Sequence, residues 1–276
     1  MDKEQAYLFS NKNEFIVTIE VVPPQGNSGD NVLEKLSNLA GLSFKGFSVA
    51  SNPVAKPKMS AMVFSHLIQK VTGKPAILHC TIRDHNRLGL QSELWGAKAM
   101  GIDTVIAVTG DPSASGADNP TEFVGDLNVF ELITLIKNSD LYTGAVLDFR
   151  PEVNGLDHEI KRLEQKVAAG CQFVVTQPVY DEDTAKAIFS GIRHLNIPVI
   201  MGILPLLSYK HAKFLHDKVD GIAVPKFLQQ QMKKSKNPVN YGVSQAKEML
   251  DLAKTMFSGA CIMPPFDRYE ILKDIL

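Results

Sequence analysis

One carboxylate inside an apolar strand is the first residue of this sequence whose setting favours chemistry. Glu20 lies in the apolar run at residues 15–22, where strand alternation places it on the same face as Thr18. Burial of an unpaired carboxylate costs free energy, and the loss of water raises its pKa towards neutrality. A carboxyl group that keeps its proton near neutral pH is suited to act as a general acid. The alternative is a structural glutamate paired with an arginine or lysine of a neighbouring strand, and the spacing supports both.

Further polar residues stand where other apolar runs end, and most of them also have a simpler explanation. Asn52 follows one run, Gln177 follows another, and Asp111 stands in a Thr-Gly-Asp-Pro turn. Asp111 is equally explained as a turn cap, because Asp-Pro is common in turns, and Gln177 as an ordinary loop amide. The polar run Arg-Asp-His-Asn at residues 83–86 fits a solvated salt-bridge patch. His79, inside a predicted strand, fits a satisfied core histidine.

The stretch at residues 75–112 indicates how such side chains are positioned. An apolar run at residues 77–82 ends in the polar run at 83–86, and a segment with apolar side chains every three or four positions follows until Gly101. A second apolar run at residues 104–108 ends in Thr-Gly-Asp-Pro. This order predicts a strand–helix–strand unit. Its two strands run in parallel, so both polar ends emerge on the same side of the sheet.

The same alternation continues along the whole chain. It predicts strands at residues 15–22, 44–50, 77–82, 104–108, 142–147, 172–176, 198–203 and 260–263, with residues 221–224 as a weaker rival for the last place. It predicts helices at residues 30–42 with Asp30 as N-cap, at 59–72 between Ser60 and Gly73, and at 127–137 and 157–169. No GxGxxG opens a helix after a strand, which argues against an open dinucleotide-binding sheet. We therefore expect an α/β fold, one (β/α)8 TIM barrel spanning residues 1–276, with its chemistry on the loops at the carboxyl ends of the strands.

The composition excludes several classes of protein. The chain has a net charge of −1 and no basic stripe, so it is not expected to bind nucleic acid. Its three cysteines form no CxxC pair and its seven histidines no ligand cluster, so we expect free thiols and no metal. The most apolar later run, at residues 197–207, is too short for a membrane span. Residues 1–15 lack an apolar signal core, and we expect a cytoplasmic protein.

The polar strand ends form an ordered set that resembles the methylenetetrahydrofolate reductase family. The motifs are Glu-Val-Val-Pro-Pro from Glu20, His-Cys-Thr from His79, Arg-Asp-His-Asn-Arg from Arg83, Thr-Gly-Asp-Pro from Thr109, Lys-Val-Ala-Ala-Gly from Lys166, Thr-Gln-Pro-Val-Tyr-Asp from Thr176, Gly-Ile-Leu-Pro from Gly202 and Met-Pro-Pro-Phe-Asp-Arg-Tyr from Met263. The similarity covers nearly the whole chain. Each motif alone is weak, but their order is specific.

The resemblance implies a flavoprotein barrel that reduces 5,10-methylenetetrahydrofolate to 5-methyltetrahydrofolate, with FAD as cofactor and NADH or NADPH as electron donor. In that family the glutamate matching Glu20 is the acid that helps to open the imidazolidine ring, and the aspartate matching Asp111 lies beside the flavin and the pterin. The resemblance assigns substrate binding to Gln177, Arg268 and Asn52. It assigns the lining of the flavin and its phosphates to His79, Thr109, Gly110, Asp111, Val124, Asp126 and Lys166.

The sequence also departs from the family pattern at positions that grip the flavin's ribityl and diphosphate groups. A tyrosine and a histidine of the bacterial enzymes are absent from residues 146–152, and Gln165 replaces a basic residue. These changes leave FMN as an alternative to FAD. The motifs at residues 51–53 and 58–60 resemble the branch found in anaerobes and in enzymes fused to methyltransferases.

Two other interpretations of the resemblance stay open. The first is a pterin- or folate-binding barrel of the methyltransferase class without a redox role. The second is a subunit that is active only with a partner protein. We expect small-molecule substrates and a homo-oligomer, with a complex with a redox or methyltransferase partner as a further alternative.

Overall fold

The strands close into a barrel. The computed structural model describes residues 7–11, 14–112, 122–148, 155–219 and 221–276, and within them eight parallel strands pair in the order of the sequence, with the first strand against the last. The strands are β1 (Ile16–Val21), β2 (Gly46–Val49), β3 (Ala76–Thr81), β4 (Thr104–Val108), β5 (Tyr142–Leu147), β6 (Phe173–Pro178), β7 (Val199–Ile203) and β8 (Gly259–Ile262). The predicted (β/α)8 barrel is confirmed.

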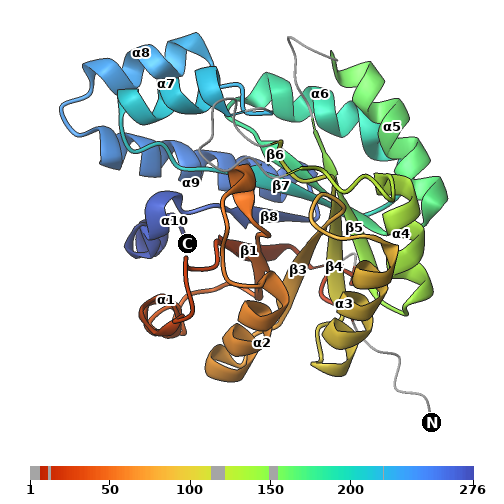
Figure 1. The fold of residues 1–276 in the computed structure, drawn as a ribbon. Coiled ribbons are helices and arrows are strands. Elements are labelled where there is room, and N and C mark those ends of the chain that lie inside the picture. The colour runs from red at the N-terminus through yellow and green to blue at the C-terminus, as the bar shows by residue number, and fades with distance from the viewer. Residues whose placement is uncertain (1–6, 12–13, 113–121, 149–154, 220) are drawn as a thin grey trace.

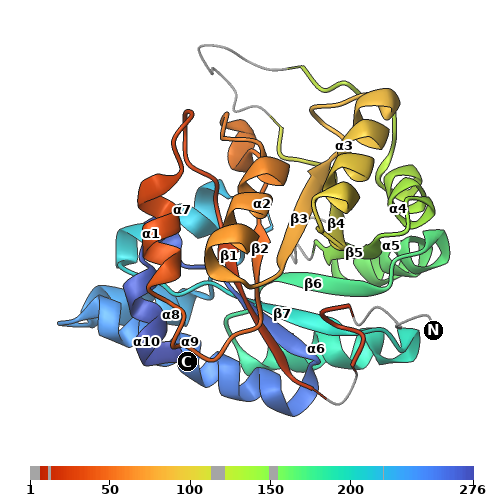
Figure 2. The ribbon, with the colours of Figure 1, turned by 90° about the horizontal axis from the view of Figure 1, so that it is seen from below.

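Helices alternate with these strands and surround the barrel (Figure 1). They are α1 (Asp30–Ser37), α2 (Ala61–Thr72), α3 (Arg87–Ala99), α4 (Val129–Asn138), α5 (Gly155–Ala169), α6 (Glu182–Ile192), α7 (Tyr209–Lys218), α8 (Lys226–Lys234), α9 (Pro238–Met256) and α10 (Leu272–Ile275). Figure 2 shows α1, α2 and α3 following one another across one flank of the barrel. No helix in the described ranges combines the length and apolar character that crossing a bilayer requires.

The last predicted strand, at residues 260–263, is confirmed as β8, and its weaker rival at residues 221–224 contains no strand. The predicted start and end of the first helix are corrected. Asp30 is the first residue of α1 and not its cap, since its carboxylate accepts a hydrogen bond from Ser28 Oγ at 3.0 Å and Gly29 occupies the N-cap position. The helix ends at Ser37, because Leu39, Ala40 and Leu42 each donate to the carbonyl three positions earlier, in turns tighter than an α-helix. The cap predicted for α2 is confirmed, as Ser60 Oγ accepts from the Val63 N–H.

Aromatic side chains fill the amino-terminal end of the barrel. The Tyr142 ring stacks between Tyr7, at a centroid distance of 4.9 Å, and Phe173, at 5.3 Å, and Phe9 packs on Phe173. Gly144 makes room for this packing, because a Cβ atom there would lie 2.3 Å from the Phe173 ring. The floor of the barrel, defined by these four aromatic residues, is therefore a packed core. The open end is the one that carries the loops after the strands.

Candidate active site

Most of the predicted site residues lie at the carboxyl-terminal end of the barrel. Glu20 and Gln177 stand near the ends of β1 and β6, while Asn52, Asp111 and Arg268 lie in the loops that follow β2, β4 and β8. All strands are parallel, so these five positions share one end of the barrel, which we call the mouth. Their separation in sequence is therefore compatible with one binding site.

Glu20 lies on the inner face of β1. Ile16 belongs to the barrel interior, and strand alternation puts Thr18 and Glu20 on the same face, nearer the mouth. Burial raises the pKa of Glu20 from 4.5 to about 7. No lysine or arginine in the described ranges forms an ion pair with it. Its setting is thus that of a carboxyl group able to hold a proton at neutral pH.

A neutral histidine lies two strands away on the same inner surface. Ser48 is the register partner of Glu20 on β2, and its Oγ atom lies 2.8 Å from His79 Nε2 on β3. Burial lowers the pKa of His79 to about 4, so the imidazole is uncharged at neutral pH. The inner wall beside Glu20 therefore offers hydrogen-bonding groups without adding positive charge.

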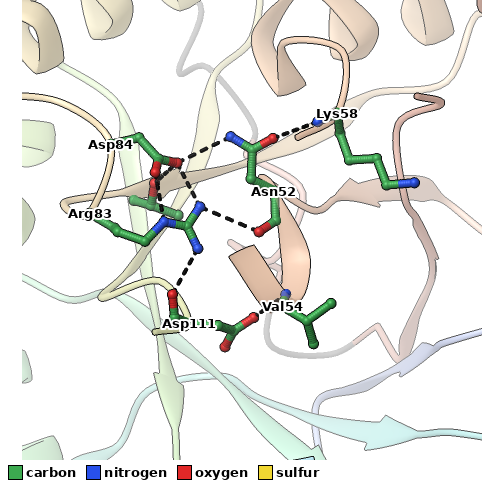
Figure 3. Close-up of polar contacts among 7 residues, drawn as sticks. Asn52, Val54, Lys58, Arg83, Asp84 and Asp111 are labelled. Atoms are coloured by element: carbon green, nitrogen blue, oxygen red, sulfur yellow. Dashed lines mark hydrogen bonds and ion pairs between the residues drawn. The ribbon is translucent and has the colours of Figure 1, made fainter. Parts of the chain in front are cut away.

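Asp111 holds the loop that follows β2. Its Oδ2 atom accepts a hydrogen bond from the Val54 N–H at 2.5 Å (Figure 3). Asn52, Val54 and Ala55 all have positive φ angles, between 43° and 55°, which is a costly conformation for residues other than glycine. Such a backbone persists only where its surroundings fix it. Asp111 therefore fixes a loop 57 positions away in the sequence, whereas the simpler interpretation expected it to cap its own turn.

Arg83 lies at the centre of this loop cluster and is buried, with 2% of its surface exposed. Its guanidinium donates to both Asp84 carboxylate oxygens, at 2.6 and 2.7 Å, and to the backbone carbonyls of Asp111, at 2.9 Å, and Asn52, at 3.3 Å (Figure 3). The interpretation of residues 83–86 as a solvated patch is therefore wrong for Arg83. Asn86, at the end of that run, is the N-cap of α3.

The flavin-lining residues predicted around β4 lie close to this cluster. Thr109 and Val124 are exposed, and the Val124 N–H donates to the Arg83 carbonyl at 3.0 Å. Asp126 accepts from the Arg87 N–H at 2.6 Å. Gly110 has a φ of +89°, and a Cβ atom there would lie 2.9 Å from the Arg83 Cβ, so glycine is needed at this position.

Lys166 is placed differently from the other predicted residues. It lies in the last turn of α5 with 6% of its surface exposed, and its Nζ atom donates to the Val146 carbonyl at 2.6 Å. Burial lowers its pKa. It is the only cation among the residues predicted to line the flavin, and its ammonium group is already bound to β5. Of residues 146–152, where the family carries its tyrosine and histidine, residues 149–152 lie outside the described residues.

Gln177 and Arg268 occupy the β6–β8 side of the mouth. Gln177 is half-buried and lines a small pocket with Tyr180, Gly221 and Ala223. Arg268 is exposed and forms an ion pair with Glu270. Phe266, beside it, is 75% exposed and has a positive φ angle, which the sequence does not reveal because an isolated phenylalanine in a proline-rich run carries no recognisable pattern.

The described residues at the mouth fit the ring of a flavin but not its phosphates. The exposed Thr109 and Val124 and the bare Gly110 offer polar and apolar contacts to a planar ring at the mouth. The diphosphate of FAD requires cations or free backbone N–H groups, and the Lys166 ammonium group is buried against a carbonyl. The observed donors therefore fit the ring of a flavin better than its phosphates. No group of three metal-ligating side chains occurs among the residues that the structure describes.

Together, the barrel and the residues at its mouth define a TIM-barrel protein with a protonatable carboxyl group at the mouth. A family model described as methylenetetrahydrofolate reductase matches residues 6–261. The chain belongs to the methylenetetrahydrofolate reductase family.

Known relatives are similar at low identity. A protein from Caenorhabditis elegans named probable methylenetetrahydrofolate reductase (NADPH) is 24% identical over 88% of this chain and 38% of its own length. The 5,10-methylenetetrahydrofolate reductase of Salmonella typhimurium is 25% identical over 77% of this chain and 71% of its own length. The chain thus spans about two fifths of the nematode relative.

Among solved structures, an uncharacterized protein from Clostridium thermocellum superimposes with a TM-score of 0.69 and 20% identity. The superposition covers 97% of this chain and 95% of that protein, which is described as binding two copies of 5-methyl-5,6,7,8-tetrahydrofolic acid. At this identity the likeness establishes the common fold alone.

Proposed function

We propose that this chain catalyses the flavin-dependent reduction of 5,10-methylenetetrahydrofolate to 5-methyltetrahydrofolate, with Glu20 as the general acid. The observation that carries the proposal is the Glu20 carboxyl group, on the inner face of β1 near the mouth, whose pKa burial raises to about 7. Membership of the reductase family supports this reaction over others that a TIM barrel can host. The reaction runs as two half-reactions in a ping-pong scheme.

Glu20 serves the folate half-reaction. The imidazolidine ring opens when the departing nitrogen receives a proton, because an unprotonated nitrogen is a poor leaving group. A carboxyl group with a pKa of about 7 still holds its proton at neutral pH and releases it readily. Ring opening leaves a cationic iminium group on the folate. The Asp111 carboxylate, exposed at the tip of β4, stabilises that cation by charge attraction.

When bound, a flavin would supply the hydride that the methylene carbon receives. Thr109, Gly110, Val124, Asp111 and Asp126 would hold its ring at the β4 side of the mouth, and His79, on β3, would line the same site. Lys166 is assigned to the phosphates by resemblance, and FMN is the alternative to FAD since it has one phosphate. Relatives are named for both NADPH and NADH, so either nicotinamide is a candidate electron donor.

A second candidate function is supported by the structural neighbour from Clostridium thermocellum, which is described as binding two copies of 5-methyl-5,6,7,8-tetrahydrofolic acid. In this alternative the chain is a folate-binding barrel without a redox role of its own. The buried Lys166 ammonium group is consistent with it, because a site without flavin phosphates needs no free cation there. The two candidates share a folate at the mouth and differ in the cofactor.

The absorbance spectrum of the purified protein, before and after incubation with FAD or FMN, tests the first proposal. A flavin spectrum that bleaches anaerobically with NADH or NADPH and returns with methylenetetrahydrofolate supports the reductase. Calorimetric binding of 5-methyltetrahydrofolate by a protein that stays colourless with either flavin supports the second candidate. Homo-oligomer formation and the need for a redox or methyltransferase partner remain predictions, which light scattering and assays of the isolated chain check.

A further inference from the structure

Arg83 is a buried cation with four hydrogen bonds, and only two of them neutralise its charge. The contacts to Asp84 form a bidentate ion pair. The other two go to the backbone carbonyls of Asn52 and Asp111, in the loops after β2 and β4. We propose that Arg83 is a positioning residue, which holds these two loops at the spacing that folate binding requires. The inference rests on the proposed folate site at the mouth.

The counter-ion is itself held from two sides. Asp84 Oδ2 accepts from Thr81 Oγ1 at 3.2 Å and from Asn52 Nδ2 at 3.1 Å. Asn52 therefore contacts the ion pair twice, because its side chain donates to Asp84 and its backbone carbonyl accepts from Arg83. Its side-chain oxygen in turn accepts from the Lys58 N–H at 2.9 Å (Figure 3). A shift of the arginine would thus displace Asn52 and the start of the strained loop together.

Asp111 closes the cluster from the other side. Its carbonyl accepts from Arg83 while its carboxylate binds the Val54 N–H, so the residue is fixed at both its backbone and its side chain. The loops after β2 and β4 are thereby connected twice, once through the guanidinium and once directly. These contacts set the distance between Asn52 and Asp111, the two predicted folate residues on this side of the mouth.

The shape of the guanidinium matters here as much as its charge. Three of its nitrogens donate in different directions within one plane, to three residues on different loops. A lysine ammonium group carries the same charge but lacks the planar fork, so it can neutralise Asp84 without reaching both carbonyls. A buried ion pair alone is weak evidence for a stabilising role, whereas this geometry supports a role in placing groups.

Arg83→Lys tests the proposal, and Arg87→Lys is the matched control, since Arg87 is exposed and its side chain pairs only with Glu131 among the described contacts. Hydrogen exchange measured by mass spectrometry on peptides covering residues 52–58 reports the loop directly, without any cofactor or substrate. We expect exchange in this segment to speed up by about tenfold or more in Arg83→Lys and to stay unchanged in Arg87→Lys. Unchanged exchange in Arg83→Lys would overturn the proposal.

Folate binding and turnover give the second readout. In Arg83→Lys we expect affinity for 5-methyltetrahydrofolate and turnover of methylenetetrahydrofolate to fall by about tenfold to a hundredfold, as for a displaced positioning group. Flavin content and reduction by nicotinamide should fall less than folate turnover, because only one of the two loops that Arg83 holds, the loop after β4, also lines the proposed flavin site. A uniform loss in all of these measurements indicates a merely structural residue and refutes the inference.

Thr81→Val provides a milder variant if Arg83→Lys does not fold, because it removes one support of Asp84 and keeps the ion pair. The same segment should then exchange faster, by a smaller factor, and wild-type exchange would again count against the proposal. Failure of the proposed function can be distinguished from failure of this inference. A wild-type protein that binds no folate ends the proposed function, while the exchange experiment still decides whether Arg83 positions the two loops.

Discussion

The Asp111 carboxylate binds the backbone N–H of Val54 at 2.5 Å, although the two residues follow different strands of the barrel. Val54 has a positive φ angle of 50°, which a β-branched residue adopts only under constraint. One oxygen of Asp111 is therefore occupied by the loop after β2, and the exposed carboxylate still carries its negative charge into the mouth. The residue combines a structural contact with a charge that the proposed chemistry uses.

Asp111→Asn should separate these two roles. The amide keeps an oxygen that can accept from Val54, but it loses the charge that favours a cation on the folate. We expect folate turnover to fall by about a hundredfold, the usual cost of one lost electrostatic contact at a developing charge. Reduction of the flavin by nicotinamide should change little. Stopped-flow absorbance measures each half-reaction, with the exposed Asp140→Asn as control.

Equal losses in both half-reactions of Asp111→Asn would show that the residue only shapes the flavin pocket.

Glu20→Gln is expected to slow the folate half-reaction much more than the nicotinamide half-reaction, with a larger difference than in Asp111→Asn. Glutamine keeps the shape of a protonated glutamate but cannot release a proton, while hydride transfer from nicotinamide to flavin needs no acid from the protein. Reoxidation by methylenetetrahydrofolate should fall by about 10²–10⁴, and nicotinamide-driven reduction should stay within about tenfold. If the variant reoxidises at the wild-type rate, Glu20 is a structural carboxylate.

The same substitution should change how stability depends on pH. The pKa of Glu20 is about 7 in the folded state and 4.5 when the carboxyl group is exposed to water, so the folded state holds the proton more tightly. Stability is full below about pH 4.5 and declines as the pH rises through about 7, where the folded protein must bury a charge.

Glu20→Gln removes that decline. We expect the variant to be more stable than the wild type by about 2 kcal/mol at about pH 8, allowing for partial exposure of the side chain, and equal to it near about pH 4.5. Urea unfolding at the two pH values measures the difference. A constant offset at both values would contradict the raised pKa.

Gly110→Ala tests the close packing beside Arg83. Both Gly110 and Gly73 have positive φ angles, but a Cβ atom at Gly73 meets nothing within 4 Å, whereas at Gly110 it lies 2.9 Å from the Arg83 Cβ. Gly73→Ala should cost about 1 kcal/mol of unfolding free energy for the backbone alone. Gly110→Ala should cost about 2–4 kcal/mol, because the contact adds to that strain. Similar costs in chemical denaturation would mean that the Arg83 side chain moves away freely.

The sequence allowed the barrel to be predicted because its period is regular. Apolar runs, polar ends and glycine stops recur with each unit, and Ser60 and Gly73 mark the ends of α2 as predicted. The ends of α1 were harder to place. Nothing in the sequence distinguishes a helix that continues to position 42 from one that ends at Ser37 and is followed by tighter turns, since both bury the same apolar side chains.

The sequence predicted which residues stand at the ends of the strands, but not the hydrogen-bond network that joins them. Glu20 is recognisable because a charge interrupts an apolar strand. Arg83 is not, since a polar run after a strand looks the same whether its arginine is exposed or buried. Its burial depends on contacts with Asn52 and Asp111, which lie 31 and 28 positions away. Contacts of that range follow from the closed barrel and not from local spacing.

The aromatic floor of the barrel has a consequence for the renewal of the acid. Tyr7, Phe9, Tyr142 and Phe173 close the amino-terminal end of the described barrel, so a hydronium ion or buffer molecule approaches Glu20 from the mouth. In the proposed reaction the folate occupies that same entrance. The carboxyl group then gives up one proton in each catalytic cycle and regains it only after the product has left the mouth. Reprotonation of Glu20 in that case follows directly on release of the methylated folate, so slow product release would limit both.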